Sequence, residues 1–326
     1  MKVFATSQLP GEALLRLEQH CDLSVWEEAR PVPADVLGEK LASCQGLLCL
    51  LTNRVDAALL SRCPDLAFVS SMSVGVDHVD VAALSRRHIP LGFTPGVLVD
   101  TTADLTLALL LAAARRIPEA DRFVREGRWN PAEPWHPDMF VGKDLAGATL
   151  GILGLGAIGQ AVAQRAAAFG MRLVGWNRTP RELPGVELLA FEDVLAQADF
   201  LSIHVALTDD TRMLVDRAAI EAMKPGAVLV NTARGGIVDE QALADALTSG
   251  HLFSAGVDVF AREPVATDNP LLSLTNVVVA PHIGSATRHT RQRMADLAVD
   301  NLLDALQGQP MRYCFNPEVY GDFPGG

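Results

Sequence analysis

The chain has 326 residues, of which 49% are hydrophobic and 20% are charged, so it can bury the cores of two domains and is too apolar to be disordered. Its formal net charge of −12 leaves no basic face for a polyanion, which argues against nucleic acid as a partner. The five cysteines are scattered and form no C-x-x-C pair. We therefore expect no disulfide framework and no metal site, and a cytoplasmic location fits best.

The N-terminal sequence MKVFATSQLPG predicts a first strand and a turn, because it lacks the long apolar segment of a secretory signal. The longest apolar run, LTLALLLAAA at 105–114, is about half as long as a membrane span requires. It predicts a buried helix, and we expect no membrane partner.

Short apolar runs alternate with helical patterns in the first part of the chain, which is typical of parallel sheets built from β-α-β units. The predicted strands of this series are 2–6, 23–26, 46–51, 67–72 and 89–94. A long helical pattern follows from about 100 to 126, and then an irregular stretch that contains Trp129 and Trp135.

The alternation then resumes, and the predicted strands of the second series are 148–154, 171–176, 200–205, 227–231, 254–259 and 276–280. Six strands suit a doubly wound nucleotide-binding domain. A last helical pattern at 290–308 is expected to pack on the first domain. The fold class is therefore α/β, with two doubly wound parallel-sheet domains.

The stretch GILGLGAIGQAVAQRAAAFG places Gly154, Gly156 and Gly159 in a G-x-G-x-x-G pattern, directly after a strand and at the opening of a helix. Missing side chains there let the backbone approach a pyrophosphate at the helix N-terminus. We expect Ala157 and Ile158, inside the pattern, to contact the same cofactor. The alternative is a tight turn without a ligand.

The end of the next strand indicates which dinucleotide is bound. An acidic residue that binds the ribose 2′-hydroxyl of NAD is usual there, but this strand ends in WNRTPR, with Asn177 at that place. Arg178 can pair with a 2′-phosphate, and Asn177 or Thr179 can hydrogen-bond it, with Arg181 as a weaker second contact. This pattern predicts NADPH, with NADH possible but weaker, unless Arg178 is only a solvated loop cation.

The last three strands are each followed by one charged or titratable group, namely Arg234, Glu263 and His282. Ligands of open parallel sheets bind at the carboxyl ends of the strands, so the three groups are expected to converge. Arg234 would hold a substrate carboxylate and polarise its carbonyl, and His282 would donate a proton as hydride reaches carbon. Glu263 would orient the imidazole and favour its protonated form. Each residue alone is more often solvated or structural, but together they predict carbonyl reduction.

Several long motifs resemble the D-isomer-specific 2-hydroxyacid dehydrogenase family: GLGAIGQAVAQ, MKPGAVLVNTARGGIVDEQALADAL, GVDVFAREP and APHIGSAT. With SVGVDHVD and TPGVLVDTTADLTLALLL, the resemblance covers nearly the whole chain. It implies a Rossmann nucleotide-binding domain inserted into a flavodoxin-like substrate domain, with the site in the cleft between them. We expect residues 1–99 and 286–326 to form the substrate domain and 100–285 the NAD(P)-binding domain.

The resemblance assigns the three strand-end groups the roles given above and adds substrate contacts. It implies that the backbone N–H groups of Val74 and Gly75 bind the substrate carboxylate and that Leu51 lines the pocket. Two assignments stay open at this point. Asp258 either contacts the nicotinamide amide or caps its own loop, and Ser285 either contacts the substrate or caps the following helix.

Within the family, TPGVLVDTTAD, PHIGSATRHTR, NLLDALQGQPM and WNR are most similar to the glyoxylate and hydroxypyruvate reductase branch. This similarity implies NADPH-dependent reduction of glyoxylate to glycolate and of hydroxypyruvate to D-glycerate. The alternatives are a dehydrogenase for another D-2-hydroxy acid and a non-catalytic, dinucleotide-sensing corepressor. A homodimer is also implied, in which Trp129 and Trp135 either form an arm, with a Trp reaching toward the partner's site, or pack in the chain's own hinge.

Overall fold

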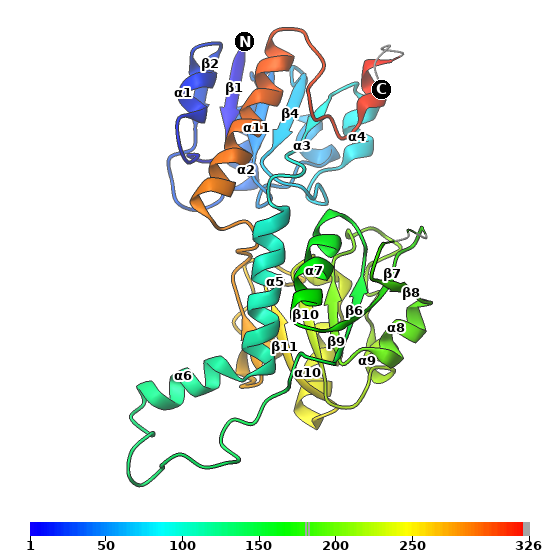
Figure 1. Cartoon of the computed structure of the whole chain (residues 1–326). Coiled ribbons are helices and arrows are strands. Elements are labelled where there is room, and N and C mark those ends of the chain that lie inside the picture. The colour runs from blue at the N-terminus through cyan, green and yellow to red at the C-terminus, as the bar shows by residue number, and fades with distance from the viewer. Residues whose placement is uncertain (180, 182, 322–326) are drawn as a thin grey trace. The chain divides into compact units, whose positions relative to one another are not determined.

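The computed structural model describes residues 1–179, 181 and 183–321 (Figure 1). The chain forms two compact units. The first unit consists of Met1–Leu98 and Ser285–Gly326, and the second unit consists of Val99–Gly284. Each unit is described by itself below.

The first unit contains a parallel sheet with the strand order β2-β1-β3-β4-β5, which is the flavodoxin-like doubly wound order. Its strands are β1 (Lys2–Ala5), β2 (Asp22–Val25), β3 (Gly46–Cys49), β4 (Phe68–Ser71) and β5 (Leu91–Gly92). Its helices are α1 (Ala13–Glu18), α2 (Ala34–Leu41), α3 (Ala57–Ser61), α4 (Val81–Arg86), α11 (Arg288–Leu306) and the 3₁₀ turn η3 (Pro317–Tyr320).

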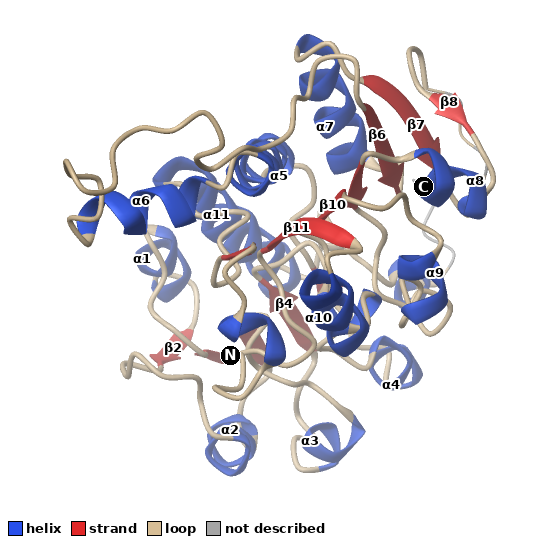
Figure 2. Cartoon of the chain, turned by 90° about the horizontal axis from the view of Figure 1, so that it is seen from below, coloured by secondary structure: helices blue, strands red, loops and turns tan. Residues whose placement is uncertain are grey.

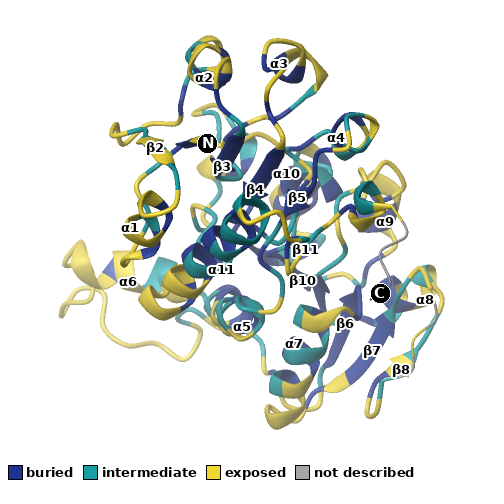
Figure 3. Cartoon of the chain, turned by 90° about the horizontal axis from the view of Figure 1, so that it is seen from above, coloured by how far each residue is buried: buried dark blue, intermediate teal, exposed yellow. Residues whose placement is uncertain are grey.

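Helices cover both faces of this sheet, which explains why every residue of the inner strands β3 and β4 is buried. One core cluster joins the sheet to α2, α3 and α4, and a second joins it to α1 and α11. Figure 3 shows β3 and β4 in the dark blue of buried residues. The five strands predicted for this part of the chain are all present. Four are shorter than their predicted runs, and β2 has the predicted length but begins one residue earlier.

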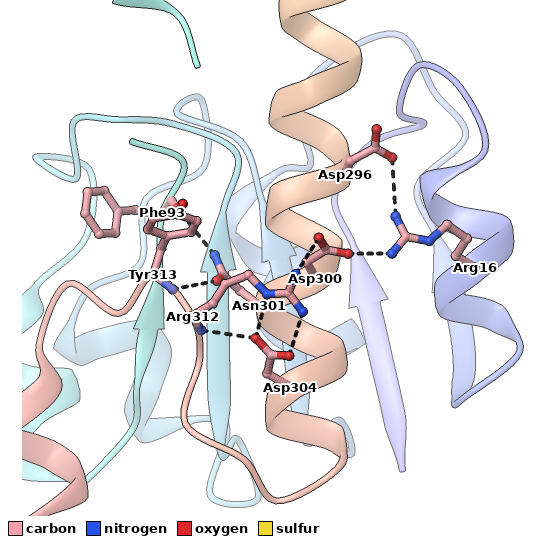
Figure 4. A network of polar contacts seen from close by, with 8 residues as sticks. All are labelled: Arg16, Phe93, Asp296, Asp300, Asn301, Asp304, Arg312 and Tyr313. Atoms are coloured by element: carbon pink, nitrogen blue, oxygen red, sulfur yellow. Dashed lines mark hydrogen bonds and ion pairs between the residues drawn. The ribbon is translucent and has the colours of Figure 1, made fainter. Parts of the chain in front are cut away.

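A network of charged side chains fastens the C-terminal segment to α11 (Figure 4). The Arg312 guanidinium contacts Asp304 at 2.8 Å and Asp300 at 2.9 Å. Asp300 also pairs with Arg16 of α1, which reaches Asp296 at 3.4 Å. Because the carboxylates lie along one face of α11, the helix links α1 to the segment that follows it.

The second unit contains a seven-stranded parallel sheet with the order β12-β11-β10-β9-β6-β7-β8. The strands are β6 (Thr149–Leu153), β7 (Arg172–Trp176), β8 (Glu187–Leu188), β9 (Phe200–Ile203), β10 (Ala227–Asn231), β11 (Leu252–Val257) and β12 (Val277–Val279). Its first strand, β6, lies inside the sheet, and the chain winds outward from it in both directions, as in the Rossmann fold. The edge strand β8 was not predicted, since two residues are too short to show a pattern.

Two layers of helices cover the second sheet. They are α5 (Val99–Ala114), α7 (Ala157–Ala168), α8 (Phe191–Gln197), α9 (Arg217–Glu221) and α10 (Glu240–Ser249), with the 3₁₀ turns η1 (Gly235–Ile237) and η2 (Pro270–Ser273). The remaining helix, α6 (Ile117–Arg125), follows α5 and belongs to neither core cluster of this unit. One core cluster includes α8, α9 and α10, and another includes α5 and α7. The helices α5 and α7 lie side by side (Figure 2), where Arg165 pairs with Asp100 and Asp104.

The single helix predicted for 100–126 is wrong, because the chain breaks between α5 and α6. Arg116 has a left-handed backbone, with φ of 55°, and Figure 1 shows α6 turning away from α5. Pro118 lacks an N–H and its ring would clash with the carbonyl of Ala114, four residues earlier. That carbonyl instead accepts a hydrogen bond of 2.9 Å from the Lys143 backbone.

The apolar run LTLALLLAAA lies within α5, half of whose residues are buried. Across the described residues, no helix is both long enough and apolar enough to cross a membrane.

Candidate active site

The glycine pattern forms the turn between β6 and α7. Gly154 has φ of +98°, and a side chain there would run into the backbone of His204 at the end of β9. A side chain at Gly159 would run into the carbonyl oxygen of Gly154. Both positions therefore require glycine for the fold, because the helix begins in direct contact with the preceding turn.

Gly156 differs from the other two glycines, since no atom lies within 4 Å of the position that its Cβ would take. It is the N-cap of α7, whose first residues are Ala157 and Ile158. The first N–H groups of a helix have no partner within the helix, and the helix dipole favours an anion there. The open space and the unpaired donor positions of the helix fit the pyrophosphate of a dinucleotide.

Asn177 follows β7 at the position that the sequence suggests for the ribose. Its Oδ1 accepts a hydrogen bond of 3.1 Å from the Leu155 N–H, and its Nδ2 donates to the Thr179 carbonyl at 2.6 Å. The Asn177 side chain therefore links the end of β7 to the glycine turn by hydrogen bonds. Arg178 is exposed, and its Nη1 lies 3.1 Å from Oδ2 of Asp210. Sequence reasoning missed Asp210, which belongs to no motif and lies 32 residues from Arg178.

Arg234 lies in the turn between β10 and η1. The Asn231 side chain fixes this turn, accepting from the Ala233 N–H at 3.0 Å and donating to the Arg234 carbonyl at 3.0 Å. A side chain at Gly235 would run into the backbone of Phe260, after β11. The ends of β10 and β11 are therefore packed directly against each other, and the charge of Arg234 lowers the pKa of Glu263.

Glu263 and His282 form a hydrogen-bonded pair, with Glu263 Oε2 2.7 Å from His282 Nδ1. The other carboxylate oxygen accepts from the Phe260 N–H at 3.0 Å. Burial raises the pKa of Glu263, but the hydrogen bond and charge of His282 and the Phe260 N–H lower it, and the net pKa lies below its usual value. Glu263 is thus a carboxylate over the neutral pH range, and the structure brings it together with His282 as the sequence suggests.

The backbone around His282 is held by Asp258, which is 1% exposed. The His282 N–H donates to the Asp258 carbonyl at 2.8 Å, and the Asp258 carboxylate accepts from Ile283 at 2.7 Å and Gly284 at 2.8 Å. His282 itself has φ of 54°, in the left-handed region that costs a non-glycine residue free energy. Both carboxylate oxygens of Asp258 therefore cap the loop that presents the imidazole, which is one of the two alternatives left open by the sequence.

The expected substrate contacts of the first unit lie in loops after its strands. Leu51 lies in the turn after β3, and Val74 and Gly75 lie in the loop after β4, all partly buried. Ser285 is not the cap of α11, because that cap is Thr287, whose side chain accepts from the Thr290 N–H at 3.2 Å. The capping alternative for Ser285 is therefore wrong.

In the part of the chain that the structure describes, no group of three or more His, Cys, Asp or Glu side chains is arranged to hold a metal ion. His204 is partly buried beside Ser202, with its Nε2 at 2.7 Å from the hydroxyl, and burial lowers its pKa to about 3.

The doubly wound sheet has a glycine turn that fits an anion, and an arginine and a histidine–glutamate pair follow its strand ends. These features are typical of a dinucleotide-dependent oxidoreductase. The sequence model of the D-isomer specific 2-hydroxyacid dehydrogenase, NAD binding domain, matches residues 107–284. The chain belongs to the D-isomer specific 2-hydroxyacid dehydrogenase family, and its cofactor is a nicotinamide dinucleotide.

Relatives match along the whole chain. The chain is 44% identical to a glyoxylate reductase of Korarchaeum cryptofilum, over 100% of this chain and 98% of that protein. A crystal structure of a protein from Thermus thermophilus has a TM-score of 0.91 and 47% identity, covering 97% of this chain and 100% of that one. An NADPH-dependent glyoxylate/hydroxypyruvate reductase from Sinorhizobium meliloti, in complex with NADP and malonate, has a TM-score of 0.86 and 33% identity, covering 97% of each chain.

Proposed function

We propose that this protein reduces small 2-oxoacids, glyoxylate to glycolate and hydroxypyruvate to D-glycerate, with NADPH as the preferred cofactor. The observation that carries the proposal is the pair of Glu263 and His282, whose Oε2 and Nδ1 atoms lie 2.7 Å apart. The names of the relatives support the substrate, since proteins called glyoxylate reductase match 98% or more of this chain at 40–46% identity.

The bound cofactor supplies a hydride to the carbonyl carbon of the substrate. Arg234 binds the substrate carboxylate and polarises the carbonyl through its positive charge. The Nδ1–H of His282 donates to Glu263, so Nε2 is the ring nitrogen that delivers a proton to the carbonyl oxygen. Glu263 fixes the tautomer and stabilises the positive charge of the imidazolium.

We assign substrate binding to the first unit and cofactor binding to the second, with boundaries at 1–99, 100–285 and 286–326. In this assignment the backbone N–H groups of Val74 and Gly75 bind the substrate carboxylate, Leu51 lines the pocket and Ser285 contacts the substrate. Asp258 keeps one lone pair on each carboxylate oxygen beyond its two loop hydrogen bonds, which leaves an acceptor for the nicotinamide amide.

The NADPH preference rests on the end of β7. Arg178 is exposed there, and a guanidinium pairs well with a phosphate. Asn177 holds the loop through its contacts with Leu155 and Thr179, and Thr179 offers a hydroxyl. Replacing Arg178 by Ala should raise KM for NADPH far more than KM for NADH, and an equal effect on both cofactors would refute the phosphate contact.

We further propose a homodimer. The arm formed by α6 and the segment after it exposes large apolar side chains, namely Ile117, Val124, Trp129, Trp135 and Val141. Exposed apolar groups that are gathered on one segment favour a protein interface over solvent. Replacing Trp129 and Trp135 by Ser should shift the sedimentation coefficient from that of a dimer to that of a monomer.

The reaction itself is tested with His282→Ala. Turnover of glyoxylate should fall about 10²- to 10⁴-fold, the range expected for loss of a general acid, while NADPH still binds. Turnover that survives the substitution would show that the proton comes from another group. Cofactor binding by the unaltered protein without turnover of any 2-oxoacid would instead favour a dinucleotide-sensing protein.

A further inference from the structure

We infer that Asp210 is a specificity-determining residue, whose carboxylate opposes the 2′-phosphate of NADPH and so allows NADH to be used as well. This inference rests on the proposed role of Arg178 in binding that phosphate. Asp210 belongs neither to the three strand-end residues nor to the glycine pattern. It is a second determinant of the cofactor preference and acts against Arg178.

The contact that carries the inference joins the loops after β7 and β9, the two strands that flank β6 in the sheet. Arg178 follows β7, and Asp210 lies in the loop after β9, with 3.1 Å between Nη1 and Oδ2. Both side chains are exposed, at 67% for Arg178 and 76% for Asp210. A ligand that reaches Arg178 from solvent therefore meets a guanidinium that already has an anionic partner.

Hydrogen bonds hold the backbone of the loop that carries Asp210, so the loop keeps Asp210 beside Arg178. The adjacent Thr211 is buried, and its hydroxyl donates to the Ala206 carbonyl at 2.6 Å. The Thr208 N–H donates to Thr211 Oγ1 at 2.8 Å, and the Arg212 N–H donates to the Thr208 carbonyl at 2.9 Å. These bonds fix the turn on both sides of Asp210.

The two cofactors differ at this place by the charge of one phosphate. When Arg178 binds a 2′-phosphate, that dianion comes within a few ångströms of the Asp210 carboxylate, and like charges at such distances repel even in water. NADH presents a neutral hydroxyl there and meets no such repulsion. Asp210 therefore weakens the binding of NADPH but not that of NADH. The preference for NADPH that Arg178 provides is smaller than it would be without Asp210.

The test measures kcat/KM for NADPH and for NADH at low ionic strength in Asp210→Asn, with Asp209→Asn as the control. Asp209 is the exposed neighbour of Asp210, so its substitution removes the same charge one residue away. Asp210→Asn should raise the ratio of NADPH to NADH efficiency about five- to tenfold, mainly through a lower KM for NADPH. Asp209→Asn should change the ratio less than about twofold, and about 0.5 M salt should reduce the effect of Asp210→Asn.

A ratio that stays unchanged or falls in Asp210→Asn would overturn the inference. Arg178→Ala separates this failure from failure of the proposed function. If Arg178→Ala selectively impairs NADPH while Asp210→Asn leaves the ratio unchanged, only the role of Asp210 is refuted. If Arg178→Ala affects both cofactors equally, the phosphate contact and the role of Asp210 are both refuted.

Discussion

Replacing Glu263 by Gln removes one negative charge from its pair with His282, to which we assign the proton transfer, and changes little else. Gln can still accept from the Phe260 N–H, which donates to Glu263 at 3.0 Å, but it no longer places a carboxylate 2.7 Å from His282 Nδ1. A hydrogen bond between charged groups contributes about 1.5–3 kcal/mol, against about 0.5–1.5 kcal/mol for a neutral one. Since each 1.36 kcal/mol is a factor of about ten, the difference of about 1–1.5 kcal/mol should lower kcat roughly 5- to 12-fold.

The assay is steady-state reduction of glyoxylate at saturating NADPH between about pH 5 and pH 10. The pKa of Glu263 is lowered in the fold, so its charge is present above the usual carboxyl value and is lost only as pH falls through the lowered value. Glu240→Gln is the matched control, because Glu240 accepts from the Ala261 N–H on the same loop without contacting His282. If Glu263→Gln keeps kcat within about twofold at neutral pH, the charge of Glu263 does not support the proton transfer.

Three further predictions concern cofactor binding and stability. Gly156→Ala should bind NADPH at least about tenfold more weakly, and its Tm should be unchanged because the added Cβ meets no protein atom. Gly159→Ala should lower Tm as well, because its added Cβ meets a backbone carbonyl. Unaltered Tm in both variants would refute the packing argument. His204, with a pKa lowered to about 3 from 6.5, must stay neutral in the fold, so its contribution to stability declines as pH falls below 6.5. At pH 5 this should lower the free energy of unfolding by roughly 2 kcal/mol. Measured by urea unfolding, the His204→Gln variant should lose less stability than the parent protein between pH 7 and pH 5. Arg312→Ala should lower the free energy of unfolding by about 1 kcal/mol at pH 7. The Arg312 hydrogen bond lowers the pKa of Asp304, so the difference should shrink below about pH 4, and a constant difference would exclude this charge pairing.

Much of the geometry at the strand ends could be predicted because it depends on local rules. A glycine pattern after a strand specifies a turn without side chains, and polar residues after parallel strands gather at one edge of a sheet. Glu263 and His282 lie 19 residues apart but follow adjacent strands, β11 and β12, so their pairing follows from the strand order. The sequence also contains a signal for the helix break at Arg116, because Pro118 is a helix-breaking residue. We predicted one continuous helix because we gave more weight to the apolar pattern.

The remaining features depend on contacts between loops, which no local pattern records. The ion pair of Arg178 with Asp210 and the bonds of Asp258 to Ile283 and Gly284 join loops that lie 25 or more residues apart. The cap of α11 is local, but Ser285 and Thr287 are both suitable capping residues, and only the backbone path selects Thr287.

The most direct test of the central claim follows the loss of reduced-nicotinamide absorbance with the purified protein. NADPH and NADH are each compared with glyoxylate, hydroxypyruvate and pyruvate as substrates. We predict turnover of glyoxylate and hydroxypyruvate with NADPH, and slower turnover with NADH. Cofactor binding without turnover of any of the three oxoacids would contradict the proposed reductase function.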